Sequence, residues 1–245
     1  MTADFGHRPV IPPIVLPHVL TLASSVLERF ATAYLPDVSD AVGQLYTMDR
    51  GIRPIYAPVR RLVGQALTVK AQPGDNLTVH GALAMVRDGD VLVIDWRGTD
   101  ACATGAGSLA LPIKAGLRGA VVDGGWRDVE ELQALDFPVF ARGISAFSPP
   151  KSRPGEINVP VACGGVVVQP GDVVVADGEG VVIVPRGFAG IVAESLREYV
   201  PHRSVDEWDH RKLARAQRER LAFFEDRVRE GGGATPSSDP SDGGT

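Results

Sequence analysis

Arg127 and Asp128 are adjacent in the chain and follow an apolar run, residues 120–123, and the glycine pair Gly124 and Gly125. The run is expected to form a buried strand, and α/β proteins tend to bind ligands just beyond the carboxyl ends of such strands. Arginine recognises a carboxylate through two parallel hydrogen bonds. A single aspartate can anchor Mg²⁺, which completes its coordination with water and substrate oxygens. The pair therefore predicts a site for a small carboxylic acid and a divalent metal ion.

A loop of small residues, Gly105, Ala106, Gly107 and Ser108, precedes that strand and leads into a helix-like stretch at 108–115. A glycine turn at the start of a helix exposes backbone N–H groups, and the helix dipole favours negative charge there. The four residues are short enough for a ligand to touch the backbone. They are expected to bind the carboxylate, although a plain tight turn would use the same residues.

The same loop matches the dinucleotide-binding pattern GxGxxA over residues 105–110, with Asp123 in the place of the acidic residue that binds a ribose. That pattern must follow its strand directly so that the turn can hold a pyrophosphate. Here the preceding strand is expected to end at Asp95, well before Gly105. The spacing therefore disfavours a dinucleotide enzyme or a methyltransferase, and binding of NAD or S-adenosylmethionine would be the test of either.

Short β-branched runs alternate with helix-like stretches between residues 62 and 185, which indicates a mixed α/β domain. Two similar segments each lead from a Gly-Asp turn into a valine-rich run that is expected to be buried on both faces; they are 88–95 and 170–177. Strands are expected at 67–71, 91–95, 120–123, 138–141, 166–168, 173–176 and 181–184. Helices are expected at 19–34, 41–45, 76–86, 108–115, 129–135 and 188–229, with a break in the last at Pro201.

The 245-residue chain has a formal net charge of -5, which disfavours sequence-independent binding to nucleic acid. It shows no signal peptide and no apolar run of the roughly 18 residues that a membrane span needs. Its two cysteines form no CxxC pair. These features favour a cytoplasmic protein without membrane or nucleic-acid partners. The expected organisation is an extended arm at 1–18, a domain at 19–200, a helix at 201–230 and a disordered tail at 231–245.

The sequence Arg127-Asp128-x-x-Glu131 resembles the motif G-x20-R-D-x2-E/D of the 4-hydroxy-4-methyl-2-oxoglutarate and 4-carboxy-4-hydroxy-2-oxoadipate aldolases. These enzymes share their fold with the regulator of ribonuclease E activity A (RraA). The family glycine falls on Ala106 here, with a glycine on either side. The resemblance covers about residues 20–200, and the segments that carry it are 38–41, 64–69, 74–76, 89–95, 137–143 and 163–185.

The resemblance implies a single RraA-like α/β domain, of the three-layer β/β/α swivelling type, with C-terminal helices. It implies a homotrimer or homohexamer with sites near the subunit boundaries. It also implies a class II aldolase, a carbon–carbon lyase that releases pyruvate from a 4-hydroxy-2-oxo acid and decarboxylates oxaloacetate. The alternative on the same fold is a non-catalytic regulator of an RNA-processing enzyme.

By the same resemblance, residues 105–108 and Arg127 would bind the pyruvyl group of the substrate. Asp128 would hold Mg²⁺ or Mn²⁺, and Glu131 would accept a hydrogen bond from a metal-bound water behind it. The metal ion would act as a Lewis acid on the substrate.

Five further polar or aromatic residues are weaker candidates. Asp100 could orient a water or cap its loop. Asn76 is expected to cap the helix that follows it, and His80 to pack within that helix. Glu179 is expected in a hairpin turn, with a role in a neighbouring subunit's site as the alternative, and Trp126 could shape the pocket beside the arginine.

Overall fold

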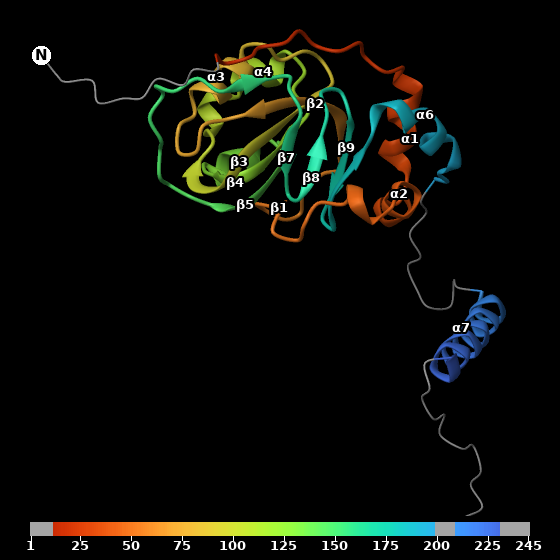
Figure 1. Cartoon of the computed structure of the whole chain (residues 1–245). Coiled ribbons are helices and arrows are strands. Elements are labelled where there is room, and N and C mark those ends of the chain that lie inside the picture. Colours follow the sequence, from red (N-terminus) through yellow and green to blue (C-terminus); the bar gives the residue numbers. More distant parts are fainter. Residues whose placement is uncertain (1–11, 199–208, 231–245) are drawn as a thin grey trace, which may run out of the picture. The chain divides into compact units, whose positions relative to one another are not determined.

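The chain divides into two units, Met1–Tyr199 and Val200–Thr245. A computed structural model describes residues 12–198 of the first unit and 209–230 of the second (Figure 1). Three parts of the predicted organisation lie outside the described residues: the start of the arm, the helix break at Pro201 and the tail at 231–245.

The first unit is built on a mixed sheet of eight strands in the order β1-β5-β4-β3-β2-β9-β10, with β6 paired to β2. Neighbours among β2, β3, β4 and β5 run parallel, whereas β1, β6, β9 and β10 are antiparallel to their partners. The strand bounds are β1 Arg53–Pro54, β2 Leu62–Lys70, β3 Asp90–Cys102, β4 Gly119–Trp126, β5 Val139–Ile144, β6 Glu156–Ile157, β9 Val173–Asp177 and β10 Gly180–Val184.

A helix follows each of the first three parallel strands, because a parallel pair needs a crossover connection. These helices are α3 (Leu77–Leu83), α4 (Ala110–Lys114) and α5 (Val129–Ala134). Their apolar side chains pack into one core cluster with alternate residues of the central strands, such as Leu92 and Val122. The parallel arrangement places the carboxyl ends of β3 and β4 side by side.

The opposite face of the sheet is covered by a small hairpin, β7 (Val161–Cys163) and β8 (Val166–Val168). Its apolar side chains pack with Val93, Val121 and Phe140, which alternate along their strands with the residues that face the helices. Hairpin, central sheet and helices make the three layers expected of the β/β/α fold class (Figure 1).

The two valine-rich segments with similar sequences lie on either side of β2, one in β3 and one in β9. The residues Val91–Ile94 and Val173–Ala176 are fully buried, which confirms strands covered on both faces. β3 runs on to Cys102 instead of ending at Asp95, through register shifts and through a positive φ at Arg97. The predicted end was wrong because a strand can continue past such an irregularity.

The antiparallel end of the sheet carries a third core cluster, formed with α1 (Ser24–Thr32), α2 (Leu35–Val42) and α6 (Ala189–Ser195). The helix expected at 19–34 is confirmed over Ser24–Thr32, whereas the helix expected at 41–45 was wrong, because α2 begins at Leu35 and ends at Val42. Proline is compatible with the first turn of a helix, and Pro36 lies in the first turn of α2. The residues expected to cap a later helix therefore lie inside this one, and a 3₁₀ turn at Gln44–Tyr46 follows.

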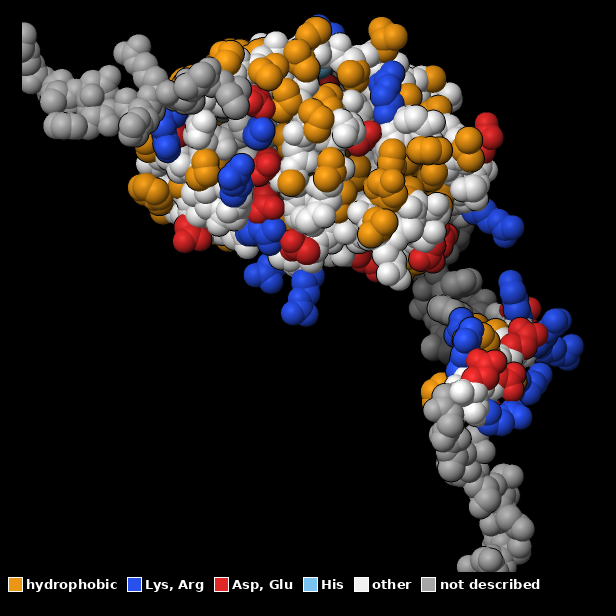
Figure 2. All heavy atoms as spheres, in the orientation of Figure 1, with side chains coloured by type: hydrophobic (Ala, Val, Ile, Leu, Met, Phe, Trp, Pro, Cys, Tyr) orange, Lys and Arg blue, Asp and Glu red, His pale blue; other side chains and the backbone are white. Residues whose placement is uncertain are grey.

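The second unit contains the helix α7 (His210–Glu230), in which no residue is buried. Figure 2 shows many basic and acidic side chains on the visible face of this helix, and three Arg–acid pairs spaced three or four residues apart form ion pairs. None of the described helices is long and apolar enough to span a membrane.

Candidate functional site

The sharp turn between β4 and α5 presents Arg127 and Asp128 together. β4 ends at Trp126, and α5 begins at Val129 with Asp128 at its N-cap position. Asp128 has the left-handed conformation, with φ 58° and ψ 46°, which aspartate adopts at lower cost than most residues. Its Oδ2 accepts a hydrogen bond of 2.9 Å from the backbone N–H of Ala106. The carboxylate is therefore held by the glycine loop that follows β3.

Gly105 is required at this junction by the space available. A Cβ atom there would lie 2.0 Å from Oδ2 of Asp128 and 3.0 Å from Nε of Arg127. Any side chain would push the charged pair out of place. The structure thus brings together two segments, 105–108 and 127–128, that are separated by a helix and a strand in the sequence.

The Arg127–Asp128 pair keeps most of its bonding capacity. Nε of Arg127 lies 3.8 Å from Oδ1 of Asp128, too far for a hydrogen bond. This Nε is buried and has no hydrogen-bond partner among the described residues. The two side chains are 39% and 35% exposed, so a ligand can reach them. Oδ1 and the guanidinium are thus available to a small molecule.

The glycine loop offers fewer backbone donors than its sequence predicts. The N–H of Ala106 binds Asp128, and the N–H of Ser108 binds the carbonyl of Gly105 within a 3₁₀ turn, Ala106–Ser108. A substrate carboxylate cannot use either donor without displacing its present partner. A substrate carboxylate would therefore depend more on Arg127, and less on the backbone of the loop, than the sequence predicts.

One argument against a dinucleotide site was wrong, and another replaces it. β3 ends only three residues before Gly105, so the spacing does fit the pattern. However, Asp123 cannot bind a ribose while it is hydrogen-bonded to Arg142 and to the N–H of Gly164. The helix that follows the glycine loop, α4, also has only five residues, which is short for the helix of a dinucleotide-binding unit.

A divalent cation fits the donors at this site. Mg²⁺ commonly binds through one or two carboxylates and keeps several waters, and Oδ1 of Asp128 accepts no hydrogen bond from residues 12–198 or 209–230. No group of three His, Cys, Asp or Glu side chains in the described part of the chain could enclose a metal. The fitting ion is therefore one held by Asp128 with water and substrate.

Glu131 lies one helical turn beyond Asp128, on α5. Its side chain is exposed, and within residues 12–198 it forms no hydrogen bond or ion pair. Glu131 therefore lies at the same end of α5 as Asp128, the carboxylate that it would assist.

The surroundings of the pair are buried and polar in part. Thr104 Oγ1, Trp126 Nε1 and Asn76 Oδ1 are buried and lack hydrogen-bond partners among the described residues. Burial raises the pKa of the Cys102 thiol, and Arg127 and Asp128 act on it in opposite directions. A neutral thiol next to the pair argues against a thiolate nucleophile.

Asn76 occupies the predicted N-cap position of α3 but does not cap it. Its Nδ2 donates instead to the carbonyl of Ala103, at 3.0 Å, and Asp75 Oδ1 accepts from the N–H of Leu77. The expectation for the side chain was wrong because the neighbouring aspartate is closer to that donor. Asn76 thereby braces the segment that leads into the glycine loop.

His80 and Glu179 lie in the elements predicted for them, whereas the side chain of Asp100 has no hydrogen-bond partner within residues 12–198. His80 is half-buried in α3, and burial lowers its pKa. Glu179 lies in the β9–β10 turn, where its N–H binds Asp177. Asp100 is exposed at a hollow of about 300 Å³ whose lining includes Gly124, Gly125 and Arg142.

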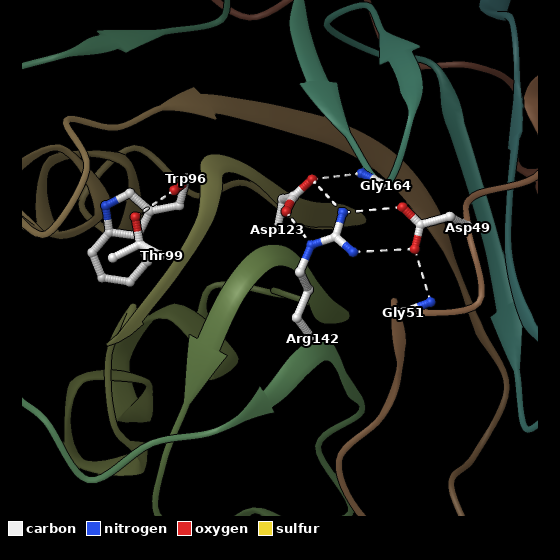
Figure 3. A network of polar contacts seen from close by, with 7 residues as sticks. All are labelled: Asp49, Gly51, Trp96, Thr99, Asp123, Arg142 and Gly164. Carbon is white, nitrogen blue, oxygen red and sulfur yellow. Dashed lines mark hydrogen bonds and ion pairs between the residues drawn. The ribbon is translucent and has the colours of Figure 1, made fainter.

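A second Arg–Asp cluster, missed by the sequence analysis, lies on the hairpin side of the sheet (Figure 3). Arg142 on β5 donates to both oxygens of Asp123 and to both oxygens of Asp49. Asp123 also accepts from the N–H of Gly164, and Asp49 from that of Gly51. The hydrogen bonds that Arg142 donates to Asp123 and Asp49 raise the pKa of its guanidinium above an already high value. No spacing in the sequence pointed to this cluster, because its three charged residues lie far apart in the chain.

The family model described as RraA-like: Aldolase/RraA matches residues 35–183 of this chain. The chain belongs to the Aldolase/RraA family. The family assignment confirms the resemblance inferred from the sequence, and the matched segment includes both the glycine loop and the Arg127–Asp128 pair.

Individual relatives in the Aldolase/RraA family are named for aldolase activity or for RNA processing. A candidate 4-hydroxy-4-methyl-2-oxoglutarate aldolase of Halalkalibacterium halodurans is 39% identical over 66% of this chain and 77% of its own length. One from Arabidopsis thaliana is 37% identical over 64% of this chain and 96% of its own. The crystal structure of Streptomyces coelicolor RraAS2, of the RNase ES inhibitor RraA family, superposes with a TM-score of 0.65 and 27% identity, covering 72% of this chain and 92% of that one.

Proposed function

We propose that this Aldolase/RraA family member is a divalent-metal-dependent aldolase that cleaves a 4-hydroxy-2-oxo acid to pyruvate and also decarboxylates oxaloacetate. The observation that supports it best is the unsaturated Arg127–Asp128 pair facing the Gly105 cradle. The names of the curated relatives point the same way. Sites near subunit boundaries in a homotrimer or homohexamer belong to the same proposal, and light scattering after size exclusion would measure the assembly.

In this reaction the guanidinium of Arg127 binds the carboxylate next to the keto group. Asp128 would hold a divalent ion, which would supply Lewis acidity at the keto oxygen. The C4 hydroxyl loses its proton to solvent water, which also supplies the proton that C3 takes later. The C3–C4 bond breaks, and the electron pair of that bond moves into the pyruvate half. Negative charge then develops on the keto oxygen, close to the positive charge of Arg127, which stabilises the transition state.

The product balance follows from the same electron movement. C4 leaves as a carbonyl, and C3 takes a proton to give the methyl group of pyruvate. Oxaloacetate uses the same arrangement, because loss of carbon dioxide from C4 leaves the same electron pair on C3. The roles of Arg127 and Asp128 are identical in the two reactions. Glu131 is proposed to accept a hydrogen bond from a metal-bound water.

The test is pyruvate release from 4-hydroxy-4-methyl-2-oxoglutarate and, separately, from oxaloacetate, with Mg²⁺, with Mn²⁺ and with EDTA. Release that requires the metal and is lost in Asp128→Asn supports the proposal. Absence of release from both substrates, by a protein that is folded and binds Mn²⁺, would overturn it.

The second candidate function is regulation of an RNA-processing enzyme by direct contact. It is favoured by the likeness to RraAS2, a member of the RNase ES inhibitor RraA protein family. The Arg127–Asp128 pair is not needed for that role. Inhibition of a ribonuclease of this type that persists in Asp128→Asn would establish it.

A further inference from the structure

A segment at residues 147–155, here termed the strap, passes beside the glycine loop and is fixed along its length. The carbonyl of Phe147 accepts from the N–H of Cys102 at 2.9 Å. At the other end, the N–H of Gly155 donates to Oγ1 of Thr78 at 2.6 Å. A Cβ on Gly155 would lie 2.1 Å from the carbonyl oxygen of Lys70, so the strap lies directly against β2.

The middle of the strap is held by Asp75, whose side chain is fully buried. The carboxylate accepts from the N–H and the hydroxyl of Ser152 and from the N–H of Arg153, at 2.7–3.0 Å. Burial by itself would raise the pKa of Asp75, but hydrogen bonds from Ser152, Leu77 and Arg153 outweigh it and lower the pKa. The anchor is thus a charged acceptor at neutral pH, and such hydrogen bonds are the stronger kind.

Asn76 connects the strap to the candidate site. Its N–H donates to the carbonyl of Pro150 at 3.1 Å, and its Nδ2 donates to the carbonyl of Ala103 at 3.0 Å. Asn76 is 3% exposed, so neither contact is loosened by water. The strap and the approach to the glycine loop are therefore joined by one buried residue.

Lys151 lies between two fixed residues of the strap, Pro150 and Ser152, yet its own side chain is exposed and without an ion-pair partner in the described part of the chain. Its neighbour Pro150 is joined through Asn76 to Ala103, two residues before Gly105, which places Lys151 beside the approach to the candidate site.

The charges of Lys151, Arg127 and Asp128 all influence the pKa of the Cys102 thiol. These three side chains together carry one positive charge; the divalent ion of the proposed function would add two, and the carboxylate on Arg127 would remove one. A second anionic group on the substrate would reduce the remaining positive excess.

We propose, on the basis of the proposed function, that Lys151 binds the carboxylate of the substrate that is remote from the keto group. Lys151 is then a specificity-determining residue that favours 2-oxo acids with two carboxylates over those that end in a neutral group. The fixed strap reduces the entropy lost when the lysine binds, because its backbone is already ordered. Lys151 has no role in bond cleavage.

The experiment compares a substrate with two carboxylates, 4-hydroxy-4-methyl-2-oxoglutarate, with one that has a single carboxylate, 4-hydroxy-2-oxopentanoate. In Lys151→Met the value of kcat/KM for the first is expected to fall about tenfold, through KM, as for loss of a charged hydrogen bond. The value for the second is expected to stay unchanged. Lys151→Arg should recover most of the loss, since it restores the charge.

Lys114→Met is the matched control, because Lys114 is an exposed lysine at the far end of α4. Equal effects of Lys151→Met on both substrates, or no effect on either, would overturn the inference while leaving the aldolase proposal intact. If wild-type protein cleaves neither substrate, the aldolase proposal fails. Calorimetric binding of 2-oxoglutarate and 2-oxobutyrate then decides, and the inference stands only if Lys151→Met weakens the dianion selectively.

Discussion

The Arg142 cluster and the Arg127–Asp128 pair both lie in the first unit, and they differ in how far their hydrogen-bonding capacity is used. Arg142 makes hydrogen bonds to both oxygens of Asp123 and of Asp49. Arg127 and Asp128 are adjacent but make no hydrogen bond to each other, and Nε of Arg127 is buried without a partner in the described structure. Leaving a buried polar atom unpaired costs free energy, so the second arrangement is maintained only if a ligand or solvent completes it.

The comparison supports the proposal that Arg127 and Asp128 bind a ligand, whereas the fully hydrogen-bonded Arg142 cluster stabilises the fold. Asp123 and Arg142 join β4, β5 and the β7–β8 hairpin through buried or half-buried contacts. Substitutions should therefore separate the two clusters into one that controls stability and one that controls activity.

The largest effect is expected from Asp128→Asn. Asparagine tolerates the left-handed backbone and keeps an oxygen for the N–H of Ala106, but it removes the charge that would hold the cation. Metal-dependent pyruvate release should fall roughly 10³-fold, which corresponds to about 4 kcal/mol of transition-state stabilisation. Steady-state kinetics and Mn²⁺ binding would measure this, with thermal unfolding as the control. A variant that retains full activity would make Asp128 structural, like Asp123.

Arg142→Met should lower the free energy of unfolding by about 3 kcal/mol, because it leaves Asp123 buried without its charge partner. Asp123 is 11% exposed and Arg142 34%, so the loss lies towards the lower end of the range for buried pairs. Urea unfolding would measure it. The control is Arg118→Met, which breaks an exposed pair with Asp88 and should cost less than about 1 kcal/mol.

The Arg142 cluster also predicts how stability depends on pH. A hydrogen bond from Arg142 lowers the pKa of Asp49 below its ordinary value of 3.8. This contribution is present above that value and is lost as the pH falls through the lowered pKa of the folded state. The stability difference between wild type and Arg142→Met should therefore shrink in acid. A difference that stays constant below pH 3.8 would contradict this assignment.

Gly105→Ala should disturb both properties, since the new methyl group would lie 2.0 Å from Oδ2 of Asp128. Overpacking of this kind costs about 1–3 kcal/mol of stability, and the displaced carboxylate should reduce pyruvate release in addition. Gly107→Ala is the control for stability, because its Cβ would meet no atom within 4 Å. Equal unfolding free energies for the two variants would show that the loop moves aside freely.

The smallest effect is expected from Glu131→Gln. The side chain is exposed and would act on the metal through water, so a roughly tenfold loss of pyruvate release is expected. The loss should appear in kcat, together with weaker Mn²⁺ binding, while the free energy of unfolding stays unchanged. An unaltered kcat would remove Glu131 from the site and leave Arg127 and Asp128 as its charged residues.

The sequence determined the layers of this protein because its patterns are local. Continuous valine-rich runs, Val91–Ile94 and Val173–Ala176, are explained only by burial on both faces. The Arg127-Asp128-x-x-Glu131 spacing and the glycines upstream were also readable without coordinates, and they led to the correct family. Helix bounds were less predictable: α2 begins at Leu35 with Pro36 in its first turn, whereas the aspartates and serine at 37–40 suggested the cap of a later helix.

The tertiary structure decided which polar residues remain free to bind a ligand, because hydrogen bonds are allotted between segments far apart in the chain. Ala106 N–H is used by Asp128, Asn76 supports the approach to the loop instead of capping α3, and Asp123 is bound by Arg142. None of these partners is a sequence neighbour. Composition and spacing identify the residues that could take part in chemistry. Only the packing of β3, β4 and β5 shows which of these residues already have hydrogen-bond partners.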